Sequence, residues 1–391
     1  MTEEAKPRLF TPGPTPVPAH VMLRMAEPLI HHRSAEFRSL LARVTTNLKY
    51  LFQTDDPVLT LTCSGTGGVE ATFVSLFSPG ETVIVLNGGK FGARWVEMAR
   101  AFGLDVVEIR TPWGEAADPV AVAGALRSHT RVRGVYVTHC ETSTGTALDV
   151  KEIARVVREN SDALVCVDGI SSVGALELRC GAWGVDVCVT GSQKGLMIPP
   201  GLAFVSFGER AARAASRSKM PKYYFDLGSA LRAQEEKGDT SWTPAIALVR
   251  GADASLAMIR EEGMEHIWLR HERLAGGLRA AVAALGLTLF SSSPSNSVTA
   301  VRLPAGVEWK DLAGALRRGS GVTFAGGQGE QAGRIFRVGH LGYIDEPGIL
   351  TAVAALERAL QACGVAVDGG AGIRAAEGEF YRFTAHRRGD T

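Results

Sequence analysis

The chain lacks long apolar runs, an excess of either charge and any paired arrangement of cysteines. No run within its 391 residues is apolar for long enough to span a bilayer. The start MTEEAKPRLF carries acids where a signal peptide would carry basic residues. The 42 Lys and Arg balance 41 Asp and Glu, and the net charge of +1 argues against a polyanionic partner. We therefore expect a soluble, cytoplasmic protein that binds neither membranes nor nucleic acid.

The six cysteines argue against a metal site, because they show no paired metal-ligand spacing. Several of them fall within apparent core strands. We therefore expect reduced, buried thiols in a cytoplasmic protein. The six are Cys63, Cys140, Cys166, Cys180, Cys188 and Cys363.

Strand and helix patterns alternate from Val58 to Phe207. Most strand candidates are solid apolar runs, as expected where helices cover both faces of a mostly parallel sheet. The sequence therefore predicts an α/β fold with a seven-stranded sheet, whose ligands bind at the loops after the strands' carboxyl ends. The candidates are Val58–Thr62, Thr82–Leu86, Val106–Ile109, Val132–Thr138, Leu164–Val167, Val185–Val189 and Leu202–Phe207.

A chain of this length accommodates a large and a small domain. Five prolines within residues 1–20 predict an extended arm, and we favour a plain surface arm over a ligand contact. We expect a large domain over residues 21–250, a smaller α+β domain over 251–368 and a flexible tail over 369–391.

One lysine, Lys194, lies in the turn between the last two predicted strands. Most lysines are solvated surface residues. Here small neighbours and the run Pro199-Pro200-Gly201 shape the backbone to hold one long side chain over a site. A desolvated lysine amine loses proton affinity and can form a Schiff base with a carbonyl cofactor.

A glycine-rich turn, CSGTGG at residues 63–68, connects a strand to a helix. Free amides at a helix N-terminus and the Thr66 hydroxyl suit a phosphate, although a plain turn is an alternative. A nucleotide site is disfavoured because the GxGxxG spacing and a P-loop lysine are absent.

Three more strand ends carry candidate site residues. Asp168 ends a buried strand; it either caps the next turn or holds a pyridine nitrogen protonated. Phe91, flanked by glycine-bearing sequence, could stack on a flat ring. The hydroxyl-rich run THCETSTG at residues 138–145 could reach a phenolic oxygen or simply form a turn.

These motifs resemble the class V aminotransferases, a family of fold-type I pyridoxal phosphate enzymes, and within it the alanine:glyoxylate and serine:pyruvate aminotransferases. The resemblance extends from TPGPTPVP to the last helix and is most specific from Asp168 through GSQKG to PPG. It implies the cofactor pyridoxal 5'-phosphate, a homodimer with shared active sites, and a small amino acid and a 2-oxo acid as substrates.

The resemblance also implies residue roles. Lys194 would form the Schiff base and Asp168 would pair with the pyridine nitrogen. Ile170 would pack beneath the ring, Phe91 above it and Thr142 beside it. The phosphate contacts would be Thr66, Gly67, Gly68 and Gln193, with Thr240 and Thr243 from the neighbouring subunit.

Arg337 matches the family's arginine for the substrate carboxylate, which a guanidinium can bind through two hydrogen bonds. Arg334 is the fallback. His139 and His340 are interpreted as structural, and Arg33 receives no role. Family members often have tryptophan at the position of Phe91, histidine at Gly68 and tyrosine at Thr240, so the particular substrate stays open.

The sequence thus predicts an aminotransferase that moves an amino group from alanine or serine to glyoxylate or pyruvate. A desulfurase or lyase is a second hypothesis, but a desulfurase needs a reactive cysteine on a mobile loop and residues 298–343 contain none. Transamination of another amine, such as a phosphonate amine, also stays open. A nucleotide-binding module without enzymatic activity is the least favoured hypothesis.

Overall fold

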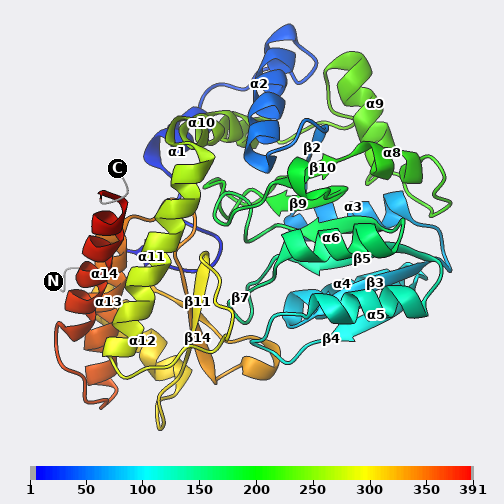
Figure 1. Ribbon diagram of the computed structural model, residues 1–391. Coiled ribbons are helices and arrows are strands. Elements are labelled where there is room, and N and C mark those ends of the chain that lie inside the picture. Colours follow the sequence, from blue (N-terminus) through cyan, green and yellow to red (C-terminus); the bar gives the residue numbers. More distant parts are fainter. Residues whose placement is uncertain (1–5, 389–391) are drawn as a thin grey trace.

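The computed structural model describes residues 6–388, and its largest feature is a seven-stranded sheet with helices on both faces (Figure 1). Its strands are β2 (Val58–Leu61), β3 (Thr82–Asn87), β4 (Asp105–Arg110), β5 (Val132–Thr138), β8 (Leu164–Asp168), β9 (Val187–Gly191) and β10 (Ala203–Phe207). Their order is β2-β10-β9-β8-β5-β3-β4. Strand β10 runs antiparallel to both neighbours, and the other pairs are parallel. The predicted fold class is confirmed.

Consecutive residues of the central strands face two different cores. In β8, Val165 and Val167 pack into one core, whereas Leu164 and Cys166 pack into the other. Both side-chain directions are therefore apolar, which explains the solid runs. Helices α2 (Ala35–Phe52), α5 (Pro119–Ser128), α6 (Val150–Asn160) and α10 (Ile246–Glu262) cover the first face. Helices α3 (Gly65–Leu76), α4 (Lys90–Ala101), α8 (Glu209–Ala215) and α9 (Leu227–Lys237) cover the second.

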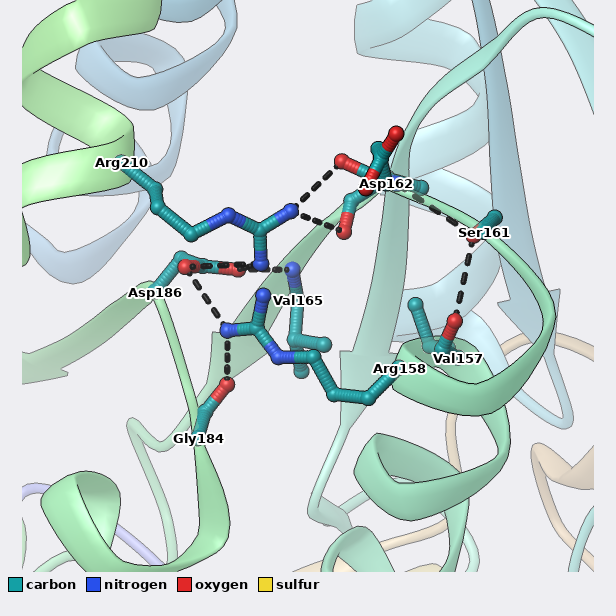
Figure 2. A network of polar contacts seen from close by, with 9 residues as sticks. Val157, Arg158, Ser161, Asp162, Val165, Gly184, Asp186 and Arg210 are labelled. Atoms are coloured by element: carbon teal, nitrogen blue, oxygen red, sulfur yellow. Dashed lines mark hydrogen bonds and ion pairs between the residues drawn. The ribbon is translucent and has the colours of Figure 1, made fainter.

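A buried carboxylate, Asp186, joins the amino ends of β8 and β9 (Figure 2). It accepts hydrogen bonds from Arg158 Nη2 at 2.8 Å and from the Val165 amide at 2.8 Å. Arg210 Nη1 lies 3.3 Å from Asp186 Oδ2. This network ties three segments together at the edge opposite the carboxyl ends of the strands.

The small domain has its own sheet and core. Strands β11 (Val298–Arg302), β14 (Ile335–Gly339) and β13 (Ala325–Gly326) pair antiparallel in that order. Helices α12 (Trp309–Ser320) and α13 (Glu346–Ala362) contribute to its core. Short elements complete the chain: β6 (Cys140–Glu141), β7 (Thr146–Ala147), α7 (Cys180–Trp183), β12 (Val322–Thr323) and the 3-10 helix η1 (Gly329–Gln331).

The change from one core to the other occurs later in the chain than predicted. Residue 251 lies inside α10, whose Val249 and Leu256 belong to the large core. The next helix, α11 (Met264–Ala284), contributes Ile267 to the large core and Leu278 to the small one. A helical period identifies an apolar stripe but not the core that it faces, so the sequence alone misplaced this boundary.

The prediction of a flexible tail is wrong for Ala371–Arg388, which form helix α14. This helix packs along α11 (Figure 1). The Phe380 ring occupies the space over Gly277 of α11. Ile373, Ala376 and Phe380 form one apolar stripe, which the surrounding charges obscure in the sequence. Residues 389–391 lie outside the described part of the chain. Neither α14 nor any other helix within residues 6–388 is long and apolar enough to cross a membrane.

The N-terminal arm is attached to the small domain. Its strand β1 (Arg8–Leu9) pairs in parallel with β12, and Phe10 is buried in the small core. Helix α1 (Ala19–Met25) then packs against α10. The arm therefore crosses from one domain to the other within about ten residues.

Candidate active site

A cavity of about 220 Å³ lies where the loops after the carboxyl ends of the strands meet. Loops after β2, β3, β5, β8 and β9 each contribute to its wall. Seven of the residues singled out in the sequence line it: Thr66, Phe91, Thr142, Asp168, Ile170, Gln193 and Lys194. Gly67, Gly68, Thr240, Thr243 and Arg337 lie outside this lining.

Lys194 is almost fully buried, with 9% of its surface exposed. Burial, which disfavours the charged ammonium, lowers its pKa from 10.5 to about 8. Its Nζ donates a hydrogen bond to the Pro12 carbonyl. The turn therefore holds an amine that is partly uncharged near neutral pH.

The N-terminal arm forms part of the cavity wall, so its interpretation as a plain surface arm is wrong. Gly13 and Pro14 line the cavity, and the Thr15 hydroxyl donates to the Lys194 carbonyl at 2.9 Å. A Cβ at Gly13 would lie 2.5 Å from Lys194 Cδ, and its φ of +124° also requires glycine. Many residues separate the arm from Lys194, so no local pattern revealed this contact.

Asp168 lies at the carboxyl end of β8 and is 6% exposed. Its carboxylate accepts hydrogen bonds from Trp95 Nε1 at 3.0 Å and from the Ile170 amide at 2.9 Å. No cationic side chain of residues 6–388 lies within salt-bridge distance. Burial is the main reason why its pKa rises from 3.8 to about 7. This carboxylate is suited to a cationic ligand atom that the chain itself does not supply.

Trp95 is a site residue that the sequence reasoning missed. It lies on α4 four residues after Phe91, hence on the same face of the helix one turn later. That spacing was visible in the sequence and could have indicated it. Its Nε1 lies 3.2 Å from Thr138 Oγ1 as well as 3.0 Å from Asp168, so it connects two strand ends.

Glu141 is a second missed residue, because its run was interpreted only through its hydroxyls. It is 2% exposed and accepts hydrogen bonds from the amides of Phe91 at 3.1 Å and Gly92 at 3.0 Å. It thereby caps the first turn of α4, and burial raises its pKa. Glu141 thus fixes the helix that carries Phe91 and Trp95.

The start of α3 has amides without a partner in the helix, and two of its residues, Gly65 and Thr66, line the cavity. Its N-cap residue, Ser64, makes no side-chain capping hydrogen bond, so the amides of Gly65, Thr66 and Gly67 have no partner in the helix. Gly68 differs, because its amide donates to the Ser64 carbonyl at 3.1 Å. A Cβ at Gly68 would lie 2.7 Å from Val189, so this glycine permits close packing of α3 on the sheet.

Arg337 lies on β14 and is 4% exposed. Three of its donors are used: Nη1 donates to the Thr142 carbonyl at 2.9 Å, and Nε and Nη2 donate to the Gly326 carbonyl. Since a guanidinium has five N–H groups, two remain for a ligand. Burial lowers its pKa to about 10, so it stays charged. The fallback, Arg334, is exposed before the start of the strand.

Thr240 and Thr243 line a separate cavity together with Tyr224 and Trp242. Arg33, which had no predicted role, holds this loop. Its Nη1 donates to the Thr240 carbonyl at 2.7 Å and pairs with buried Asp239 at 2.8 Å. The two threonines therefore do not join the Lys194 cavity of the same chain.

His139 and His340 are both fully enclosed and do not line the cavity. Burial lowers the pKa of His139 to about 4 and that of His340 well below its usual value. His340 Nε2 lies 2.9 Å from Thr299 Oγ1. Both side chains are neutral core residues, in agreement with their structural interpretation.

The donor set fits pyridoxal phosphate. The unpaired Asp168 carboxylate suits a protonated pyridine nitrogen, and the amides at the start of α3 suit a phosphate. Lys194 supplies an amine of lowered pKa in the same cavity. Each end of the cofactor therefore has a counterpart among these residues.

Comparison with known proteins agrees with this fit. The family model for class V aminotransferases matches residues 9–336. A protein named soluble hydrogenase 42 kDa subunit from Anabaena cylindrica is 43% identical, over 94% of this chain and 97% of its own length. An L-aspartate–glyoxylate aminotransferase from Paracoccus denitrificans is 37% identical, over 96% of each chain.

A solved structure is similar over almost the whole length. The pyridoxamine-pyruvate aminotransferase from Mesorhizobium loti has a TM-score of 0.92 and 30% identity, with coverage of 98% of this chain and 99% of its own. The relatives carry different names and substrates, but one family model spans most of this sequence. The chain therefore belongs to the class V aminotransferase family and is a pyridoxal phosphate-dependent transaminase.

Proposed function

We propose that this enzyme transfers the amino group of a small amino acid, alanine or serine, to glyoxylate or pyruvate. The observation that carries the proposal is that two buried groups line one small cavity: the Lys194 amine, with a pKa of about 8, and the Asp168 carboxylate, with a pKa of about 7. Two of the three relatives reported above, the L-aspartate–glyoxylate aminotransferase and the pyridoxamine-pyruvate aminotransferase, are named for a small 2-oxo acid, glyoxylate or pyruvate.

Pyridoxal phosphate, when bound, supplies a ring that takes up the electron pair left by bond breaking at the substrate's α-carbon. Lys194 is the residue proposed to hold the cofactor covalently and then to carry a proton. Its lowered pKa supports this role, because a catalytic base works best with a pKa near the operating pH. The absence of a side chain at Gly13 leaves the space that the Lys194 side chain occupies.

Asp168 is proposed to accept a hydrogen bond from the ring nitrogen and to keep that nitrogen protonated. Phe91 and Ile170 are proposed to contact the two faces of the ring, with Thr142 at its edge. Thr66, Gly67 and Gln193 are proposed to bind the phosphate; Gly68 contributes packing rather than a free amide.

Arg337 is proposed to bind the substrate carboxylate. Its two unused donors and its retained charge support a bidentate contact. The carbonyls of Thr142 and Gly326 fix the guanidinium plane, so little conformational entropy is lost when a carboxylate binds.

Thr240 and Thr243 are proposed to act in the cavity of a second copy, as part of a homodimer with shared sites. Their separation from Lys194 in the same chain supports this arrangement. Beside their loop, Tyr223 is 81% exposed and lies against Trp242 in a tilted arrangement, with ring centroids 5.1 Å apart. Such exposed aromatic area is typical of interfaces.

The desulfurase hypothesis lacks a suitable thiol. Cys140 is the one cysteine of the described chain that lines the cavity. It is buried, burial raises its pKa, and its Sγ lies 3.2 Å from the hydroxyls of Ser295 and Ser297. A thiol held in this way is a weak nucleophile, because the reactive form is the thiolate.

The test is a spectral titration of the purified, cofactor-loaded protein with single amino acids. Alanine and serine should convert the bound cofactor to its amino form, and glyoxylate or pyruvate should restore the original spectrum. Lys194→Ala should reduce turnover below detection, because the proton carrier is lost. A wild-type protein that stays colourless after loading would contradict the proposal.

A further inference from the structure

Arg94 lines the active-site cavity and has no assigned role. It lies on α4, three residues after Phe91, and its guanidinium carbon is 4.9 Å from the Phe91 ring centroid. Its one recorded side-chain hydrogen bond is from Nη1 to Thr66 Oγ1, at 3.3 Å. No carboxylate of residues 6–388 lies within salt-bridge distance of it.

Arg100 lies on the same helix and differs from Arg94 in having a carboxylate partner, because its guanidinium pairs with Glu108 at 3.2 Å. A guanidinium offers five donors, so a half-buried arginine with one long hydrogen bond lacks its acceptors. Its remaining donors are therefore available to an anion or a cluster of oxygens inside the cavity.

The charge balance of the cavity indicates which anion. A phosphate monoester carries about −1.5 to −2 charges at pH 7, whereas a helix N-terminus supplies only about +0.5. Lys194 and Arg94 are the two cationic side chains among the lining residues, and Lys194 contacts the Pro12 carbonyl. Arg94 contacts Thr66 in the first turn of α3, beside the free amides. A full positive charge there balances most of the remaining charge.

We propose that Arg94 binds the cofactor's phosphate together with the amino end of α3, and that this ion pair is a main source of cofactor affinity. The proposal rests on the assignment of the phosphate to the start of α3. Because Arg94 also contacts the Phe91 ring, it connects the phosphate end of the site to the residue proposed to cover the pyridine ring.

Two other roles for Arg94 make different predictions. It could bind the second carboxylate of a dicarboxylic amino donor, in which case substrate affinity depends on it and cofactor affinity does not. It could also merely support the Phe91 ring, in which case any ring-containing ligand loses affinity equally when Arg94 is replaced.

The experiment compares two ligands of the cofactor-free protein, pyridoxal phosphate and pyridoxal, which lacks the phosphate. Equilibrium Kd values are measured spectroscopically for the wild type, Arg94→Met, Arg94→Lys and the control Arg100→Met. We expect Arg94→Met to raise the Kd for pyridoxal phosphate about 10- to 100-fold, the range for a hydrogen-bonded charge pair. The Kd for pyridoxal should change less than about threefold. The Kd of Arg94→Lys for pyridoxal phosphate should lie between those of the wild type and Arg94→Met. The Kd of Arg100→Met should equal that of the wild type.

Inorganic phosphate gives a second measurement that does not depend on turnover. It should protect wild-type protein against thermal unfolding, and this protection should weaken in Arg94→Met. Equal losses for pyridoxal phosphate and pyridoxal would overturn the proposal in favour of ring support. Unchanged cofactor affinity with a raised KM for dicarboxylic donors would overturn it in favour of a substrate contact. Failure of the wild type to bind pyridoxal phosphate at all would instead contradict the proposed function.

Discussion

Two buried carboxylates lie at opposite ends of the neighbouring strands β8 and β9 and differ in their partners. Asp186 is surrounded by the two guanidinium groups of Arg158 and Arg210 (Figure 2). Asp168 contacts only two uncharged donors, the Trp95 indole and the Ile170 amide. Burial raises the pKa of both. Two arginines balance the charge of the first carboxylate, whereas the second has no cationic partner within residues 6–388, which is what its proposed contact with a protonated ring nitrogen requires.

The largest expected effect of this difference is a loss of stability of the cofactor-free protein between pH 4 and pH 7. The pKa of Asp168 is raised from 3.8 to about 7, so the folded state binds its proton more tightly than the unfolded state does. The contribution of Asp168 to the unfolding free energy is therefore largest below about pH 4, falls as the pH rises, and is lost above about pH 7. The shift corresponds to about 4 kcal/mol in unfolding free energy.

Urea unfolding of the wild type and Asp168→Asn across this pH range measures the effect. The variant should match the wild type near pH 4 and become the more stable protein at pH 8. With cofactor bound, its turnover should fall about 10²- to 10³-fold, the usual loss for one oriented electrostatic group. A difference in stability that does not vary with pH would show that Asp168 titrates normally.

Asp186→Asn should destabilise the protein, whereas Asp168→Asn should stabilise it at pH 8. Removing the carboxylate leaves two arginines unpaired, and we expect a loss of about 2 kcal/mol in unfolding free energy. The loss stays below that of a fully buried pair because the two arginine side chains are 31% and 28% exposed. Turnover per folded molecule should not change. Denaturation curves and activity corrected for the folded fraction test this, and a large drop in turnover would mean that the two ends of the sheet are coupled.

Trp95→Phe is the smallest of these changes. It retains an aromatic ring but removes the Nε1 donor to Asp168. We expect about a tenfold loss of turnover, since one hydrogen bond to a charged group is worth about 1.5 kcal/mol or more. The acid limb of the kcat–pH profile should move to higher pH, because the Asp168 carboxylate loses a hydrogen bond that lowers its pKa. A matched Trp113→Phe variant, outside the cavity lining, should leave both quantities unchanged.

The sequence predicts best where a residue's role depends on its immediate neighbours. All seven strands, and the placement of Lys194 and Asp168 after two of them, follow from apolar runs that end in polar residues. Trp95, Glu141 and Arg94 were missed because their roles arise from contacts between separate loops. The tail helix was missed for a similar reason, since its apolar stripe acquires meaning only against α11.

The N-terminal arm has a mechanical consequence. Its strand β1 pairs with β12 in the small domain, and a few residues later the Pro12 carbonyl accepts a hydrogen bond from the amine of Lys194 in the large domain. The segment between these two contacts is short and ends in a proline, so it has little freedom to change its length. A displacement of β12 would therefore also displace Pro12, and would lengthen or break the hydrogen bond that holds the amine of Lys194.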